Sequence, residues 1–242
     1  MKLSGTCLTA LCVAILASST IAFGWGPIAH GKAAYQALSH SSITPYLTQY
    51  GLSATTIADM AWELDLPEYK DEYHNPGWEA IRDRQWLTDP KWDELDETRR
   101  LAFLCHLACD SGVPVNHSPS GSVYTNSLVE ALLEATVEFW GDFPTITPYT
   151  GTYSQKMDAF YSQQMALANW AKNNLRWWNV PFSQGDHAGW YGLVYGQNLC
   201  QAMLLEYFQT RDGLMGMSVP EPATMALLAV GAAVVIRRRR RA

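Results

Sequence analysis

The chain has 242 residues, of which 48% are hydrophobic and 12% aromatic, and its formal net charge at pH 7 is −6. This length and apolar content predict a compact globular domain with one sizeable core. The acidic balance argues against undirected binding to nucleic acid or to anionic lipid.

The first predicted element is an export signal at residues 1–24. It combines a basic start at Lys2, an apolar run, and the small residues Ala22 and Gly24 at the two positions that a signal peptidase reads. We expect signal peptidase to cut after Gly24, so that Trp25 becomes the new N-terminus.

Residues 25–213 form the predicted exported domain, whose apolar residues recur at helical spacing. No stretch alternates between apolar and polar residues as a half-buried strand would, and there are no internal repeats. The fold class that we expect is therefore all-α, with a single multi-helix domain. The predicted helices span about 27–38, 55–64, 97–111, 127–140, 154–178 and 190–210, and residues 67–78 are expected to be irregular.

Metal-binding side chains gather at the end of the helix that carries His106. His106 and Asp110 are four residues apart, which puts both on one helix face. Gly112 and Pro114 end the helix and let His117 fold back toward that face. Three metal-competent side chains are thus expected to converge within one helical turn and one loop.

Three other residues become candidates only in combination with that stretch. His30 lies in the first helix, five residues after Trp25, Asp59 lies in the second helix, and His74 lies in the irregular segment. Each of them alone is more typical of a structural or solvated side chain than of a ligand.

Together these residues form an ordered set that resembles the zinc-dependent phospholipase C and single-strand nuclease superfamily, over residues 25–138. The resemblance implies an all-α fold in which the N-terminal tryptophan binds zinc through its own backbone. The step from Trp25 to His30 and the step from Asp59 to His74 are typical of the nuclease branch. The residues that carry the resemblance are Trp25, His30, Asp59, His74, His106, Asp110 and His117.

The resemblance implies two complete zinc sites that share Asp110 as a bridging ligand. Asp59 is, by the same resemblance, the best candidate for the catalytic group that orients or deprotonates the attacking water. The implied ligands are Asp59, His74, His106 and Asp110 for the first Zn²⁺, and Trp25, His30 and Asp110 for the second.

The sequence departs from the family at a third zinc ion. Members carry His-x3-Asp or His-x3-Glu after the last loop histidine, whereas this chain has Asn126-x3-Glu130, and asparagine is a poor zinc ligand. Either His117, Glu130 and water hold the ion, or His187 completes the site, or the site is lost. Ser127 and Glu130 also fit a capping box, which would explain Glu130 without a metal.

Three cysteines remain after signal removal: Cys105, Cys109 and Cys200. Because an exported chain meets an oxidising compartment, a disulfide from Cys105 or Cys109 to Cys200 is one expectation. The alternative is that all three are small buried apolar side chains. A bridge between Cys105 and Cys109 would be strained, because they lie one helical turn apart.

Residues 219–242 have the layout of a sorting segment. Val219–Pro222 precedes an apolar run at Met225–Ile236 and then five arginines. That run is shorter than the roughly 20 residues that a spanning helix needs. The order of the three parts, with the Pro-Glu-Pro motif before the apolar run and the arginines, resembles the PEP-CTERM sorting signal of Gram-negative bacteria, which an exosortase recognises. We therefore expect export to the cell envelope, surface or extracellular matrix, with transient membrane association through this segment.

Removal of both ends makes the domain more acidic. It leaves 11 basic and 22 acidic residues, for a net charge near −11 before any metal binds. Bound divalent cations would offset part of this charge locally.

The function that the resemblance implies is zinc-dependent hydrolysis of a phosphodiester substrate, in the manner of a secreted phospholipase C. A single-strand nuclease or nucleotidase of the same fold is the first alternative, with single-stranded nucleic acid as the substrate. The second alternative is an inactive metal-binding surface or matrix protein, which the missing histidine at the third site makes credible.

Overall fold

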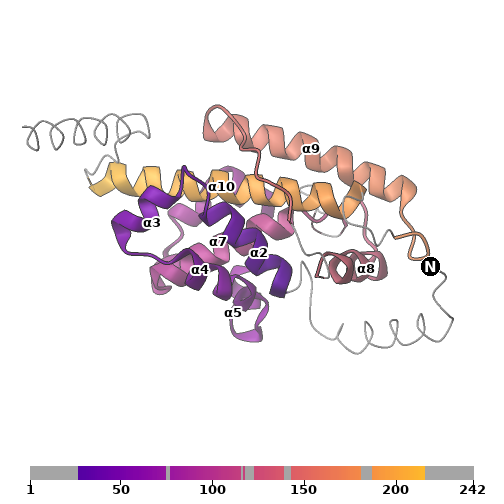
Figure 1. The fold of residues 1–242 in the computed structure, drawn as a ribbon, viewed down its shortest axis with the longest axis horizontal. Helices are drawn as coiled ribbons and strands as arrows, with labels where there is room; N and C mark the ends of the chain where they lie inside the picture. Colours follow the sequence, from indigo (N-terminus) through magenta and orange to yellow (C-terminus); the bar gives the residue numbers. More distant parts are fainter. Residues whose placement is uncertain are drawn as a thin grey trace, which may run out of the picture.

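The computed structural model describes residues 27–74, 77–115, 117, 123–138, 143–180 and 187–215, and these form helices without any strand (Figure 1). The all-α prediction is confirmed for this part of the chain. Trp25, the expected signal peptide and the expected sorting segment lie outside the described residues. The helices are α2 (Pro27–Leu38), α3 (Thr44–Tyr50), α4 (Ala54–Met60), η1 (Ala61–Asp65), α5 (Pro67–Tyr73), α6 (Gly77–Arg82), η2 (Gln85–Leu87), η3 (Pro90–Glu94), α7 (Glu97–Ser111), α8 (Ser127–Glu138), α9 (Tyr153–Asn174) and α10 (His187–Met215), where η marks a 3₁₀-helix.

Helix α7 lies in the centre of the core. Asp96 caps its first turn by accepting a hydrogen bond from the Arg99 backbone N–H at 2.9 Å. Every residue from Leu101 to Asp110 is buried, so the helix is covered on all sides. Helices α2, α4 and α10 pack against it. Any polar side chain on this stretch must therefore find its partners inside the protein.

Helices α7 and α10 approach each other more closely than side chains would allow. A Cβ atom on Gly112 would lie 2.2 Å from the Gly192 carbonyl oxygen, and one on Gly196 would lie 3.0 Å from the Cys109 carbonyl oxygen. Such distances require glycine at this crossing. Cys105, Cys109 and Cys200 lie buried along the same two helices as free thiols, in agreement with the second of the two expectations for them.

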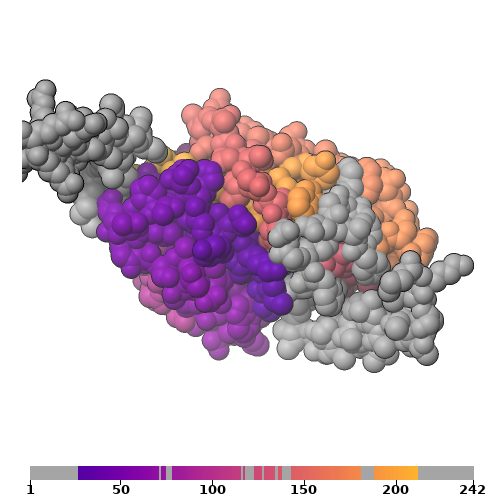
Figure 2. Space-filling view, in the orientation of Figure 1, coloured from indigo at the N-terminus to yellow at the C-terminus, as the bar shows by residue number. Residues whose placement is uncertain are grey.

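Helices α8, α9 and α10 complete the domain around α7. Figure 1 shows α9 running beside α10, and the two helices are in contact. Gln164 of α9 is fully buried and donates a hydrogen bond of 2.8 Å to the Val113 carbonyl, just past the end of α7. Figure 2 shows α2 to α5 gathered on one side of the molecule's visible face, with α9 and α10 on the other. No described helix has both the length and the apolar content to cross a membrane.

Two segments differ from the sequence expectation. The prediction that residues 67–78 are irregular is wrong, because α5 begins at Pro67 and α6 begins at Gly77. Proline suits the first helical turn, where its missing N–H is not needed. Helix α3 was also not anticipated; it is a short helix, at whose end Gly51 adopts the left-handed conformation.

The close contact at Gly112 predicts a large stability difference between two glycine substitutions. Gly112→Ala should lower the free energy of unfolding by about 1–3 kcal/mol, because its methyl group would collide with backbone atoms of α10. Gly31→Ala is the matched control, since its Cβ would meet only ordinary contact, 3.5 Å from the Ala58 oxygen. Equal stability of the two variants in denaturant unfolding would contradict the packing described here.

Candidate metal centre

Five side chains from four segments converge on the buried face of α7. Two of them, His106 and Asp110, lie one turn apart on α7 itself. His30 lies in α2, Asp65 is the last residue of η1, and His74 directly follows the last residue of α5. The three histidines and Asp110 are at most 5% exposed, and Asp65 is partly buried.

The two oxygens of Asp110 face different histidines. Its Oδ1 lies 3.2 Å from His30 Nε2, whereas its Oδ2 lies 3.2 Å from His74 Nε2 and 3.1 Å from His106 Nε2. A carboxylate that directs each oxygen to a separate set of nitrogens has the arrangement of a bridging ligand. The bridging role that the resemblance implies for Asp110 stays a prediction.

Asp65 provides a second carboxylate on the side of His74. Its Oδ1 lies 3.3 Å from His74 Nε2 and 3.9 Å from His106 Nε2. The ligand atoms thus fall into two groups that fit a metal ion, each with all atoms within 4.8 Å of one another. One group contains His30, His106 and Asp110, and the other contains Asp65, His74 and His106.

A backbone carbonyl fixes the tautomer of His106. The Nδ1 atom lies 2.8 Å from the Ala61 carbonyl oxygen, which can only accept a hydrogen bond, so Nδ1 carries the proton. In neutral His106 the lone pair then sits on Nε2 and points at the Asp110 carboxylate. Two acceptors at that distance need a cation between them, and a second hydrogen-bonded shell of this kind is typical of metal-ligating histidines.

The distances in the cluster suit zinc. Two ligands at about 2.0–2.1 Å from a tetrahedral Zn²⁺ are about 3.3 Å apart. The three nitrogen-to-oxygen distances around Asp110 are 3.1 to 3.2 Å. The rings of His30 and His106 are also parallel, with centroids 4.0 Å apart and an interplanar angle of 9°. The donor set of imidazoles and carboxylates is therefore compatible with zinc in both chemistry and spacing.

Electrostatics in the cluster favour positive charge beside Asp110. Burial alone would lower the pKa of His30, but the charge and hydrogen bond of Asp110 raise that pKa to about 10. Burial is likewise outweighed at His74, where hydrogen bonds to Asp110 and Asp65 raise the pKa to about 9. Burial and the neighbouring charge of His30 lower the pKa of His106. The cluster thus attracts cations, while His106 stays in the neutral form that a metal ion requires.

A second, smaller arrangement joins His117 and Glu130. His117 Nε2 lies 3.0 Å from Glu130 Oε1, and Glu130 is only 2% exposed. The ring of His117 lies near that of His74, with centroids 6.2 Å apart. The Val129 backbone N–H donates instead to the Asn126 side chain, at 3.1 Å. Asn126 therefore caps α8, which leaves the Glu130 carboxylate facing His117.

The structure brings together most of the residues that the sequence singled out. It groups His30, His74, His106 and Asp110, and it pairs His117 with Glu130. His187 begins α10, but its side chain lies outside the described residues, as does Trp25. His117 and Glu130 are adjacent in the structure, and the three alternatives for the third site stay predictions.

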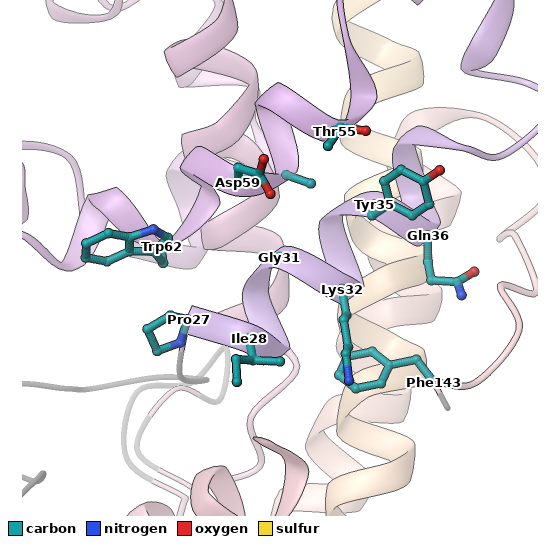
Figure 3. Close-up of a pocket in the computed structure, with 11 residues that line it drawn as sticks. Pro27, Ile28, Gly31, Lys32, Tyr35, Gln36, Thr55, Asp59, Trp62 and Phe143 are labelled. Carbon is teal, nitrogen blue, oxygen red and sulfur yellow. The ribbon is translucent and has the colours of Figure 1, made fainter. Parts of the chain in front are cut away.

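Asp59 is the exception and requires a correction. Its side chain is exposed and lines a pocket of about 610 Å³ together with Trp62 and Lys32 (Figure 3). None of the five clustered residues lines that pocket. The carboxylate beside His74 is that of Asp65, and it occupies the position that the resemblance implied for Asp59.

Helical periodicity was the signal that could have identified Asp65. Ile57, Ala58, Ala61 and Leu64 are buried, and Asp65 continues the same stripe four residues after Ala61. Asp59 falls outside this stripe. The spacing that the resemblance implies points instead to Asp59, which faces solvent.

This correction predicts different metal contents for two carboxamide variants. The mature protein should bind at least two zinc ions, and Asp65→Asn should lose about one of them, because it removes a charged ligand beside His74 and His106. Asp59→Asn, its matched control, should keep the full content. Elemental analysis after dialysis measures both, and zinc loss in the Asp59 variant alone would reverse the assignment.

Comparison with known proteins identifies one segment of the chain. Residues 218–241 match the family model of the PEP-CTERM protein-sorting motif. No match was found among the curated proteins or among the solved structures. The motif indicates a secreted protein that is sorted to the cell envelope, and it implies recognition by an exosortase.

Proposed function

We propose that the exported domain is a zinc-dependent phosphodiester hydrolase of the phospholipase C type. The observation that carries this proposal is the bridging arrangement of Asp110, whose two oxygens face His30 on one side and His74 with His106 on the other. Paired sites of this kind suit in-line displacement at phosphorus. The ordered resemblance to the zinc-dependent phospholipase C and nuclease superfamily supports the same chemistry.

Zinc would supply the nucleophile and the charge stabilisation, because it lowers the pKa of bound water to about 7 and acts as a Lewis acid. The chain's own residues have separate tasks. Asp110 would direct Oδ1 toward His30 and Oδ2 toward His74 and His106. The Ala61 carbonyl keeps the His106 ring in the orientation that presents Nε2. Asp65 would be the carboxylate that accepts a proton from water, because its Oδ1 is buried at the cluster, 3.3 Å from His74 Nε2.

His117 and Glu130 would hold a third ion with fewer protein ligands than the family provides. Their Nε2 and Oε1 atoms are buried and adjacent, whereas Asn126 is engaged as a helix cap. With two protein ligands in place of three or four, we expect this ion to bind more weakly than the others. Substrates whose leaving oxygen needs that ion should therefore react slowly.

Phospholipid is the preferred substrate for two reasons. The sorting motif directs the protein to the envelope, where phospholipid is abundant. A mature domain with a net charge near −11 is also poorly suited to a polyanion such as nucleic acid. The step from Asp59 to His74 no longer favours the nuclease branch, because the carboxylate near His74 belongs to Asp65 and not to Asp59.

A single-strand nuclease or nucleotidase is the second candidate, since the five-residue step from Trp25 to His30 still favours that branch. An inactive metal-binding surface protein is the third, since Asn126 stands where the family has a histidine. Both are outcomes of the following assay.

The zinc-loaded mature protein should release the phosphorylated headgroup from a phospholipid faster than it cleaves a single-stranded oligonucleotide. Asp110→Ala should reduce this activity to background and should lower the zinc content, because Asp110 faces all three imidazoles. Asp158→Ala removes an exposed carboxylate from α9 and serves as the control with unchanged activity. Faster cleavage of the oligonucleotide favours the nuclease, and no cleavage of either substrate favours the inactive binder.

The processing site gives a second test of this function. A backbone amine binds zinc only as a free terminus, so the Trp25 ligand would exist only after cleavage between Gly24 and Trp25. One extra residue before Trp25 should leave the fold intact, remove about one zinc ion and abolish most activity. Circular dichroism, metal analysis and headgroup release measure the three effects. A tagged form with full zinc and full activity would show that Trp25 is not a ligand.

A further inference from the structure

Two adjacent tryptophans project from the turn that follows α9. Trp177 is 56% exposed and Trp178 is 67% exposed, which makes them the two most exposed of the large apolar side chains in the described part of the chain. Their rings are in edge-to-face contact, with centroids 5.6 Å apart. Exposed aromatic surface of this kind in an otherwise acidic domain indicates a binding surface.

The turn that carries the pair is firmly built. Leu175 and Val180 are buried on either side of it, at 2% and 4% exposure. Asn179 closes the turn by accepting a hydrogen bond from the Arg176 backbone N–H at 2.6 Å and by donating one to the Asn174 carbonyl at 2.8 Å. The tryptophans are therefore held outward by a rigid support, which lowers the entropic cost of binding.

The segment that carries the pair is positively charged, unlike the whole domain. From Ala159 to Val180 the sequence contains Lys172 and Arg176 and no acidic residue. Both cations are exposed, and neither forms an ion pair with a described carboxylate. The Arg176 guanidinium donates to the Lys172 carbonyl at 3.0 Å, so it is fixed beside the tryptophans.

This combination matches the interfacial zone of a phospholipid bilayer. Tryptophan is enriched at membrane interfaces, because one end of its ring system is apolar and the other carries a polar N–H. Lysine and arginine beside it interact favourably with lipid phosphates. The sorting motif brings the protein to the cell envelope, where such a surface is present.

We propose that Trp177 and Trp178 dock the domain on phospholipid bilayers by inserting into the headgroup region, with Lys172 and Arg176 against the phosphates. The turn forms part of the same packing unit as α8, since Leu175 and Val180 pack in one cluster with Val129. Docking is a separate property from the proposed hydrolysis, because none of the metal-cluster residues belongs to the turn.

Sedimentation with sucrose-loaded vesicles tests the docking surface. The vesicles contain a phosphonate analogue of phosphatidylcholine, in which a P–C bond replaces the scissile P–O bond, so binding is measured without cleavage. The processed full-length protein should bind, and Trp177→Ala/Trp178→Ala should lower the partition coefficient at least tenfold. Tyr161→Ala/Tyr191→Ala removes two other exposed aromatic side chains and should change it less than twofold.

The wild-type and variant chains share the same C-terminal segment, so any binding through that segment cancels in the comparison. Circular dichroism checks that the double variant is folded, and Trp177→Phe/Trp178→Phe should restore part of the binding. Equal binding by the double alanine variant overturns the proposal, as does an absence of wild-type binding. If ultracentrifugation shows instead that the alanine variant loses self-association, the turn is a contact between copies of the chain, and the bilayer proposal is wrong. Failure to cleave ordinary phosphatidylcholine bears only on the proposed hydrolase.

Discussion

The carboxylate of Asp110 is the constraint on which the arrangement of the helices depends. A buried carboxylate without partners costs several kcal/mol, and Asp110 is 4% exposed at the centre of the core. Three imidazoles, from α2, from α7 and from the residue that follows α5, compensate for this cost, each within 3.2 Å of a carboxylate oxygen. Burial alone would raise the pKa of Asp110, but the charge and hydrogen bond of His30 help to hold it well below its usual range. The helices that carry these histidines cannot move independently, because each of them partners the same charge.

The position of Asp110 is fixed from the opposite side by backbone packing. Gly112 and Gly196 let α7 and α10 meet almost without intervening side chains, and Gln164 ties the Val113 carbonyl to α9. The chain that leaves α7 is thereby directed toward α8, where His117 meets Glu130. The C-terminal end of α7 therefore determines how the His/Asp cluster and the His117–Glu130 pair lie relative to each other. Helices α9 and α10 hold this end in place.

Residue spacing in the sequence predicts the central helix and its two site residues, whereas the family spacing does not predict all of the residues around them. His106 and Asp110 could be predicted because they are four residues apart in a regular helix. Family spacing does not predict Asp65, because α4 gives way to the 3₁₀-helix η1 at Ala61 and Asp65 lies after that change. Asn126 was considered only as a weak ligand, and its role as the cap of α8 depends on contacts that spacing alone does not specify. Helix α5 was missed because its buried partners, such as Trp92 against Tyr73, are distant in sequence.

Helix α8 connects the His117–Glu130 pair to the proposed docking surface. Glu130 directs its carboxylate to His117, while Val129 and Leu133 pack in the cluster that contains Leu175 and Val180, the two anchors of the tryptophan turn. A domain docked through Trp177 and Trp178 would therefore have its metal centre held at a fixed orientation to the bilayer through a single packed helix. Because a phosphodiester in a bilayer sits at headgroup depth, such a rigid link would position the site at a constant distance from its substrate. A soluble oligonucleotide would gain nothing from this link, so the proposed docking surface is physically consistent with the proposed preference for phospholipid.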